Sequence, residues 1–176
     1  MNNIFLVGPR ACGKTTVGRI VANKLQLNFF DSDALIAQKA GCEISKFVKA
    51  NGWDAFRDLE VDILKELSET ERSVVSCGGG IVVRNENYKI LKEGFTVYLK
   101  TDVETLVKRL SANPAHGQRP SLTGKSLTEE VREILETREE LYSGCATVIV
   151  SGEGKLQDIC EEIAGAFKSI ENGDNK

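Results

Sequence analysis

The sequence predicts an α/β protein in which a central parallel sheet of five strands lies between two layers of helices. Short apolar segments alternate with amphipathic segments along the chain, an order typical of parallel strands connected by helices. A glycine-bounded loop directly follows the first apolar segment. The chain has 176 residues, 41% of them hydrophobic, which suffices for one domain with a sizeable core. We expect that domain over residues 1–170 and a polar, fraying tail over residues 171–176.

Five segments have the length and apolar content of strands, and helical patterns lie between them. The expected strands are residues 3–7, 28–30, 73–76, 96–99 and 147–150. Two helices begin with the Ser/Thr-x-x-Glu pattern of a capping box. Thr101-x-x-Glu104 opens a helix that extends to residue 110, and Ser126-x-x-Glu129 opens one that extends to residue 142.

Residues 8–15 read Gly-Pro-Arg-Ala-Cys-Gly-Lys-Thr, a complete G-x-x-x-x-G-K-[ST] phosphate-binding loop. In such a loop, backbone N–H groups turn toward phosphate oxygens, and the N-terminus of the following helix adds positive potential. Lys14 is expected to reach the outer phosphates, and the Thr15 hydroxyl to bind Mg²⁺. The pattern therefore predicts that the chain binds a nucleoside triphosphate. The other residues expected at the phosphates are Ala11, Cys12, Gly13 and Thr16.

Polar residues and glycines follow the second and third expected strands, at the edge where a parallel sheet forms its ligand crevice. Asp31 is a candidate for the Mg²⁺ site, and Asp33 for the base that accepts a proton from a hydroxyl nucleophile. Alternatively, one of the two caps the following helix, because Asp is a favoured N-cap residue. The three glycines 78–80 would let the backbone approach a ligand closely, or form no more than a tight turn.

Two arginines are expected on inward faces of helices. On the helix after Gly52, Glu60 falls within an apolar face and Arg57 borders it, three residues away. Charges near a buried face are costly unless they are paired or bound to something. Arg57 is therefore a candidate clamp for a substrate carboxylate, oriented by Glu60, with a structural salt bridge as the alternative. Arg138 lies among apolar residues of a later helix, where it either extends to the rim or reaches an anion.

The polar segment 111–125, with two prolines and two glycines, is long for a loop in a compact domain. We expect a lid that keeps water off the transferring phosphoryl group, with a plain surface loop as the alternative. Arg119 in this segment is a candidate to neutralise charge on that group. Arg109, at the end of the preceding helix, is a candidate to stack on the adenine.

Composition excludes several other classes of function. A net charge of −3 argues against nucleic acid as the main partner. Five scattered cysteines without a C-x-x-C and a single histidine, His116, make a zinc site or a disulfide framework unexpected. Trp53 and the cysteines are interpreted as structural. Neither a membrane-spanning run nor a signal-peptide pattern is found. We therefore expect a cytoplasmic protein that acts on small molecules without a membrane partner. We also expect a monomer.

Taken together, these residues resemble the shikimate kinase family, from Ile4 to about Phe167. The marks are residues 8–18, 29–33 and 78–80, Phe56-Arg57-x-x-Glu60, Arg119-Pro120 and Arg138-Glu139-x-Leu141-Tyr142. The resemblance implies a three-layer α/β/α P-loop kinase with a substrate-binding helical region at about 31–62 and a lid at about 111–125. The implied activity is the transfer of a phosphoryl group from ATP, with Mg²⁺, to the 3-hydroxyl of shikimate in aromatic amino-acid biosynthesis.

The resemblance also implies a role for each matching residue. Lys14, Asp33 and Arg119 would take part in catalysis. Shikimate would be bound by Asp33, Arg57, Gly79 and Arg138, ATP by residues 11–16 with Arg109 and Arg119, and Mg²⁺ by Thr15 and Asp31. Two positions depart from the family: Ala11 stands where glycine is frequent, and Cys77 where threonine is usual. Ala11 would strain the loop if that position needs a positive φ.

Three alternatives to this function stay open at the level of sequence. A gluconate-type kinase would share a carboxylated polyol as its substrate. A nucleoside monophosphate kinase would need a base-reading pocket, which we do not locate. A non-catalytic ATP-binding switch is disfavoured by the intact Lys14, Thr15, Asp31 and Asp33.

Overall fold

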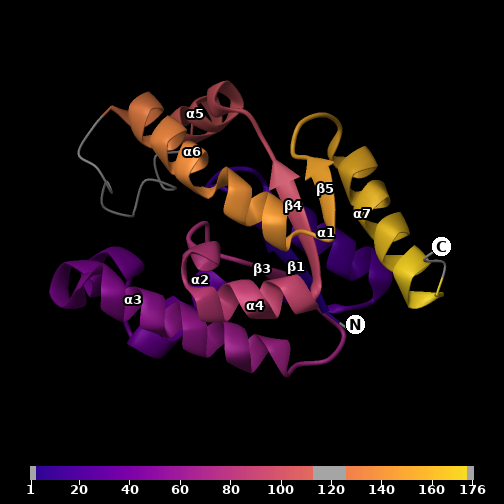
Figure 1. Cartoon of the computed structure of the whole chain (residues 1–176), viewed down its shortest axis with the longest axis horizontal. Coiled ribbons are helices and arrows are strands. Elements are labelled where there is room, and N and C mark those ends of the chain that lie inside the picture. Colours follow the sequence, from indigo (N-terminus) through magenta and orange to yellow (C-terminus); the bar gives the residue numbers. More distant parts are fainter. Residues whose placement is uncertain (1–2, 113–125, 174–176) are drawn as a thin grey trace.

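The computed structural model of the chain describes residues 3–112 and 126–173 (Figure 1). The elements in this part of the chain are, in order, β1 (Asn3–Val7), α1 (Lys14–Leu25), β2 (Asn28–Asp31), α2 (Ser32–Ala40), α3 (Ile44–Ser68), β3 (Ser73–Ser76), the 3-10 helix η1 (Ile81–Val83), α4 (Asn85–Glu93), β4 (Phe95–Lys100), α5 (Val103–Ala112), α6 (Leu127–Cys145), β5 (Val148–Ser151) and α7 (Leu156–Glu171). Residues 111 and 112 of the expected lid continue α5. The rest of that segment, with Arg119 and His116, lies outside the described residues, as do residues 174–176 of the expected tail.

The strands form one parallel sheet in the order β2-β3-β1-β4-β5, which confirms the predicted fold class. The observed strands agree with the predicted ones to within one residue at each end. β1 lies at the centre, where Leu6 pairs with Ser76 of β3 on one side and with Val97 of β4 on the other. The loops that leave the carboxyl ends of β1, β2 and β3 therefore emerge side by side at one edge of the sheet.

β1 shows why helices cover both faces of the sheet. All five of its residues are buried. Ile4 and Leu6 belong to a core that includes residues of α1 and α7, whereas Phe5 and Val7 belong to a second core that includes residues of α3 and α4. Successive side chains of a strand point to opposite faces, so a strand that is covered twice must be apolar throughout. The two helical layers are visible on either side of the sheet in Figure 1.

The predicted helix after Gly52 is the second segment of α3. Gly52 has φ 84 and ψ 171, and this non-helical residue bends α3. Beyond the bend the predicted apolar face is buried, with Phe56 and Leu64 fully inaccessible to solvent. Glu60, four residues from each of them, is equally inaccessible. The sequence pattern therefore correctly identifies a buried carboxylate inside the apolar face.

One of the two predicted helix caps is wrong. Asp102, not Thr101, caps α5: its Oδ1 accepts a hydrogen bond of 2.7 Å from the Thr105 N–H. β4 continues to Lys100, so Thr101 still lies beside the sheet, and its hydroxyl is buried without a hydrogen-bond partner within the described residues. The second capping box, between Ser126 and Glu129, is confirmed at the start of α6.

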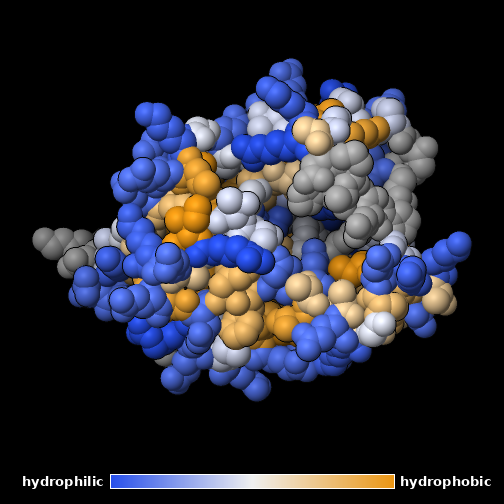
Figure 2. All heavy atoms as spheres, turned by 180° about the vertical axis from the view of Figure 1, so that it is seen from behind, coloured by the Kyte–Doolittle hydropathy of each residue, from blue (hydrophilic) through white to orange (hydrophobic). Residues whose placement is uncertain are grey.

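On the face shown in Figure 2, apolar areas lie between hydrophilic residues. In residues 3–112 and 126–173, the large apolar side chains that are exposed are Ile20, Val83, Leu127, Ile149 and Leu156. They come from five different elements or connections of the fold. Among the described residues, we find no helix with the length and the apolar character that a membrane span requires.

Candidate active site

The phosphate-binding loop connects β1 to α1 and encloses its own lysine. Lys14 Nζ donates to the backbone oxygens of Gly8 and Pro9, each at 2.8 Å, and to Cys12 Sγ at 3.5 Å. Gly13, which precedes α1, has φ 107, a conformation that favours glycine. The loop thus keeps a buried ammonium group at the N-terminus of a helix, where an anion is favoured.

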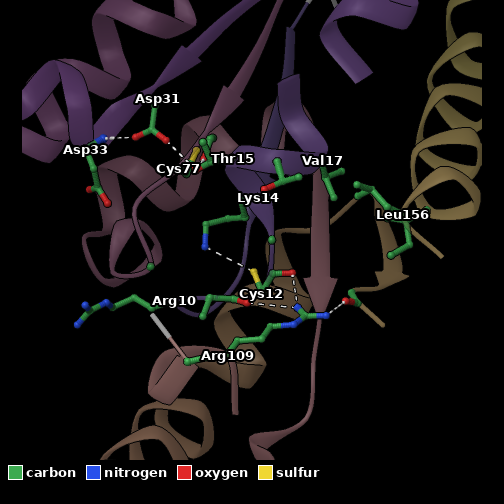
Figure 3. Close-up of a pocket in the computed structure, with 18 of the residues that line it drawn as sticks. Arg10, Cys12, Lys14, Thr15, Val17, Asp31, Asp33, Cys77, Arg109 and Leu156 are labelled. Carbon is green, nitrogen blue, oxygen red and sulfur yellow. Dashed lines mark hydrogen bonds between the residues drawn. The ribbon is translucent and has the colours of Figure 1, made fainter. Parts of the chain in front are cut away.

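A cavity of about 720 Å³ opens over this loop (Figure 3). Its lining includes all six residues predicted at the phosphates, 11–16. The predicted residues Asp31, Asp33, Gly79 and Arg109 line the same cavity. The structure therefore brings the expected nucleotide side and part of the expected acceptor side into one space. Arg57 and Arg138 do not line this cavity, and they contact the glycine turn at its border instead.

One corner of the cavity gathers hydroxyl and carboxylate oxygens. The Thr15 hydroxyl donates to Asp31 Oδ2 at 2.9 Å and lies 3.2 Å from Ser76 Oγ. Asp31 Oδ1 meanwhile accepts from the Asp33 and Ala34 N–H groups and caps α2. The predicted cap and the predicted metal position thus coincide in one residue. Ser76 was not predicted, although its place at the end of a strand beside β1 is a signal that could have indicated it.

These oxygens suit the ion that the sequence implies. Mg²⁺ prefers oxygen ligands and is typically held by one or two carboxylates together with substrate phosphates, rather than by a cage of protein groups. Thr15 and Asp31 provide such a partial set. The described part of the chain contains no group of three or more His, Cys, Asp or Glu residues that could hold a metal ion. The Thr15 hydroxyl and the Asp31 carboxylate thus offer the kind of oxygen ligands that Mg²⁺ takes from a protein.

Asp33 lies across the cavity from the phosphate loop, on the first turn of α2, as Figure 3 shows. A Cβ added at Gly78 would come within 2.6 Å of Asp33 Oδ1 and 3.0 Å of Glu60 Oε1. Gly78 also donates its N–H to Ser32 Oγ at 2.9 Å. A side chain at position 78 would collide with two carboxylates, so this position requires glycine. The sequence alone did not indicate this close approach.

Arg57 and Glu60 form a buried ion pair on α3, as both interpretations of the sequence required. The Arg57 guanidinium lies 5.6 Å from the Trp53 ring centroid and 5.3 Å from that of Phe56. It also occupies the space that a Cβ at Gly80 would take. The structural salt bridge therefore exists. It leaves the clamp hypothesis open, because a guanidinium carries five N–H donors and one carboxylate uses only some of them.

Arg138 and Tyr142 of α6 both contact the middle glycine of the turn. Arg138 Nη1 donates to the Gly79 carbonyl at 3.1 Å, and the Tyr142 hydroxyl donates to the same oxygen. The Tyr142 ring stacks on that of Tyr98, with 5.2 Å between centroids. Burial raises the pKa of Tyr142 well above its ordinary value, so the hydroxyl stays protonated and remains a donor. In the sequence, Tyr142 belongs with Val131, Ile134, Leu135 and Leu141 to the apolar stripe that surrounds Arg138. Its contact with the turn was not predicted.

Arg109 lines the cavity and also supports the phosphate loop. It donates to the carbonyls of Ala11 and Cys12, each at 3.2 Å, and to that of Gly152 at 2.9 Å. These bonds tie the loop to the segment after β5 (Figure 3). Residues 43–45, which fall within the expected substrate-binding region at about 31–62, also line the cavity. Gly152, Gly154 and Leu156 line it as well, and these three were not predicted.

Two residues that depart from the family pattern, Ala11 and Cys77, line the cavity. Ala11 has φ 64, in the left-handed region, so the strain anticipated for a non-glycine residue is present. Cys77 is only 1% exposed, and burial raises its pKa far above that of a free thiol. A buried neutral thiol is unreactive, which agrees with the structural interpretation of Cys77. All five cysteines are free.

The order of the sheet, with a phosphate loop leaving its central strand, places the chain among the P-loop nucleotide-binding proteins. A family model described as shikimate kinase matches residues 10–168. The chain belongs to the shikimate kinase family, and the resemblance seen in its motifs is confirmed.

Individual relatives agree with this assignment. The shikimate kinase of Nitratidesulfovibrio vulgaris is 47% identical over 161 residues, which cover 91% of this chain and 92% of the relative. A solved shikimate kinase from Acinetobacter baumannii, in complex with shikimate, superposes with a TM-score of 0.87 at 31% identity, over 99% of this chain and 95% of that one. A gluconokinase from Sinorhizobium meliloti has a TM-score of 0.62 at 19% identity, over 96% of this chain and 93% of that one, and shows a shared fold alone.

Proposed function

We propose that the chain transfers the γ-phosphoryl group of ATP to the 3-hydroxyl of shikimate and releases shikimate 3-phosphate and ADP. The observation that carries the proposal is one cavity lined both by the phosphate loop and by Asp33 and Gly79. Membership of the shikimate kinase family, and a relative solved with shikimate, support the choice of acceptor.

On the nucleotide side, the residues of the loop are set to receive phosphates. Lys14 Nζ, which is held by two loop carbonyls, can exchange one of them for a phosphate oxygen after a small movement. Thr15 and Asp31 would hold Mg²⁺, which supplies positive charge that neutralises the phosphates when it is bound. Arg109, tied to the loop carbonyls, keeps the shape of the loop while the nucleotide binds.

On the acceptor side, Asp33 is the proposed base. The 3-hydroxyl oxygen forms a bond to the γ-phosphorus as the bond from that phosphorus to the β,γ-bridging oxygen breaks, and the hydroxyl proton passes to the Asp33 carboxylate. Arg57 and Arg138 are proposed to bind the shikimate carboxylate from α3 and α6. Gly79 lines the cavity and also contacts Arg138. The backbone at Gly79 would therefore lie beside both the nucleotide and the acceptor.

One kinase domain over residues 1–170 would include a substrate-binding region at about 31–62 and a lid at about 111–125, in which Arg119 would neutralise the transferring phosphate. The five free cysteines fit a cytoplasmic, reducing compartment. We infer that the protein is a monomer and has no nucleic-acid partner. Light scattering after size-exclusion chromatography would measure its molar mass in solution.

A panel of acceptors tests the proposed function. ADP release is measured with ATP, Mg²⁺ and, in separate reactions, shikimate, gluconate, AMP or CMP. We expect turnover above background hydrolysis with shikimate alone. Faster turnover with gluconate or with a nucleoside monophosphate would replace the proposed acceptor. Background hydrolysis with every acceptor would indicate a nucleotide-binding switch instead of a kinase.

A further inference from the structure

The carbonyl of Gly79 has two side-chain donors, and both come from α6. Arg138 Nη1 lies 3.1 Å from this oxygen, and the Tyr142 hydroxyl donates to it as well. Two donors use both lone pairs of a carbonyl oxygen. Tyr142 is completely buried, so its hydroxyl has no competing bond to bulk water. Arg138, in contrast, is only partly buried.

The rest of the turn is held by backbone and by α2. The Gly78 carbonyl accepts from the Ile81 N–H at 3.0 Å, and the Gly80 carbonyl accepts from the Val83 N–H at 3.1 Å. The Gly78 N–H donates to Ser32 Oγ. Gly79 lies between them, and the hydrogen bonds that it forms with the described residues are those of its carbonyl with Arg138 and Tyr142 of α6. Within the described residues we find no hydrogen bond from the Gly79 N–H to another protein group, and Gly79 lines the cavity.

We propose that Tyr142 is a positioning residue for the acceptor, an inference that rests on the proposed function. Arg138 does not line the cavity, so its guanidinium has to turn from the Gly79 oxygen to reach a substrate carboxylate there. The Tyr142 hydroxyl keeps that oxygen bonded when Arg138 turns away. Without Tyr142, each binding event would leave a buried carbonyl without a donor, which is costly. Arg138 would then remain on Gly79 and compete against its own substrate contact. The hydroxyl thus releases Arg138 for the acceptor and holds the Gly79 peptide in one orientation.

The packing around Tyr142 supports a fixed hydroxyl. Its ring stacks on Tyr98, with 25° between the ring planes and 5.2 Å between centroids. Tyr98 in turn donates to Glu139 Oε2 at 2.5 Å, and Glu139 precedes Tyr142 by three residues on α6. A stacked, fully buried ring cannot turn away without opening the core, so the position of its oxygen is set by the fold.

The test compares Tyr142→Phe with Tyr98→Phe in the full chain. Each variant removes one hydroxyl from the stacked pair and keeps both rings, so thermal melts are expected to show folded proteins with similar losses of Tm. For Tyr142→Phe we expect the shikimate KM to rise about 3- to 15-fold, the range of one lost hydrogen bond, with the ATP KM within about twofold. For Tyr98→Phe we expect both KM values to stay within about twofold. Binding of shikimate is measured in parallel through the fluorescence of the single tryptophan, Trp53, which lies beside Arg57.

A shikimate analogue with a carboxamide in place of the carboxylate gives a readout that a purely structural role would not change. Because a neutral amide does not draw Arg138 from Gly79, the Tyr142→Phe penalty should shrink to about twofold or less for this analogue. Equal penalties for both acceptors, an unchanged shikimate KM, or an equal rise in Tyr98→Phe would overturn the inference and leave the proposed function standing. A wild-type chain with no shikimate-dependent ADP release would overturn both.

Discussion

The Thr15 hydroxyl donates a hydrogen bond of 2.9 Å to Asp31 Oδ2, and this bond joins the phosphate loop to the end of β2. The other oxygen of Asp31 caps α2, which carries Asp33 on its first turn. One carboxylate therefore contacts the loop expected to hold phosphates and also orients the helix that carries the proposed base. The two roles of Asp31 can be separated by substitution.

Asp31→Asn keeps the helix cap, because Asn caps helices as well as Asp does, but removes the negative charge. We expect an unchanged Tm and a higher concentration of Mg²⁺ for half-maximal turnover. Asp31→Ala removes both functions and should also lower the free energy of unfolding by about 1 kcal/mol. Magnesium titrations and thermal melts of the two variants measure this difference. An unchanged magnesium requirement in Asp31→Asn would remove Asp31 from the metal site.

Asp33→Asn should lower kcat by about 10²- to 10⁴-fold, because the amide cannot accept the hydroxyl proton. Nucleotide binding should be nearly unchanged, since Asp33 lies across the cavity from the loop. Single-turnover kinetics at saturating shikimate and equilibrium binding of ADP measure the two effects. Retention of more than about a tenth of the wild-type rate would exclude Asp33 as the general base.

Arg57→Lys and Arg138→Lys should each lower kcat/KM for shikimate by about 10- to 100-fold, although both keep the positive charge. A lysine ammonium cannot reproduce the two parallel N–H bonds of a guanidinium to a carboxylate. The loss should be smaller for the carboxamide analogue of shikimate. The same loss with both acceptors would show that the arginine serves only its protein contacts, such as the Arg57–Glu60 pair.

Gly80→Ala should reduce shikimate binding, because the added methyl would occupy the position of the Arg57 guanidinium. Overpacking of this kind typically lowers the free energy of unfolding by about 1–3 kcal/mol. Gly165→Ala is the matched control: Gly165 lies on α7, and an added Cβ meets no atom within 4 Å. It should leave activity unchanged and stabilise the chain by up to about 1 kcal/mol. Unchanged shikimate affinity in Gly80→Ala would show that shikimate binding does not depend on the observed position of the Arg57 guanidinium.

Ala11→Gly should leave the free energy of unfolding unchanged or raise it by up to about 1 kcal/mol. Glycine relieves a left-handed strain of about 1–2 kcal/mol, while its extra freedom in the unfolded chain offsets part of that gain. Ala166→Gly, on α7, is the control and should lower stability by about 1 kcal/mol. Chemical denaturation compares the two. Equal losses in both variants would show that Ala11 is not strained.

The sequence alone determined the features that depend on neighbours along the chain. The phosphate loop, the five strands and the Ser126 cap each follow from short patterns, because backbone geometry and local hydrogen bonds decide them. The buried position of Glu60 also followed, since helical spacing places it among Phe56 and Leu64. The predicted Thr101 cap is wrong because of a contact between distant segments. Pairing with β5 extends β4 to Lys100, so the helix begins only after Asp102.

Only the tertiary structure decided which distant groups meet at the site. Thr15 and Ser76, which are 61 residues apart in the chain, meet because β1 and β3 are paired in the sheet. Tyr142 reaches Gly79 because α6 packs against the turn after β3, a contact across 63 residues. No local pattern encodes such contacts, since they depend on how the helices pack on the sheet. An apolar stripe can indicate that Tyr142 is buried, but only the packed fold determines which atom its hydroxyl meets.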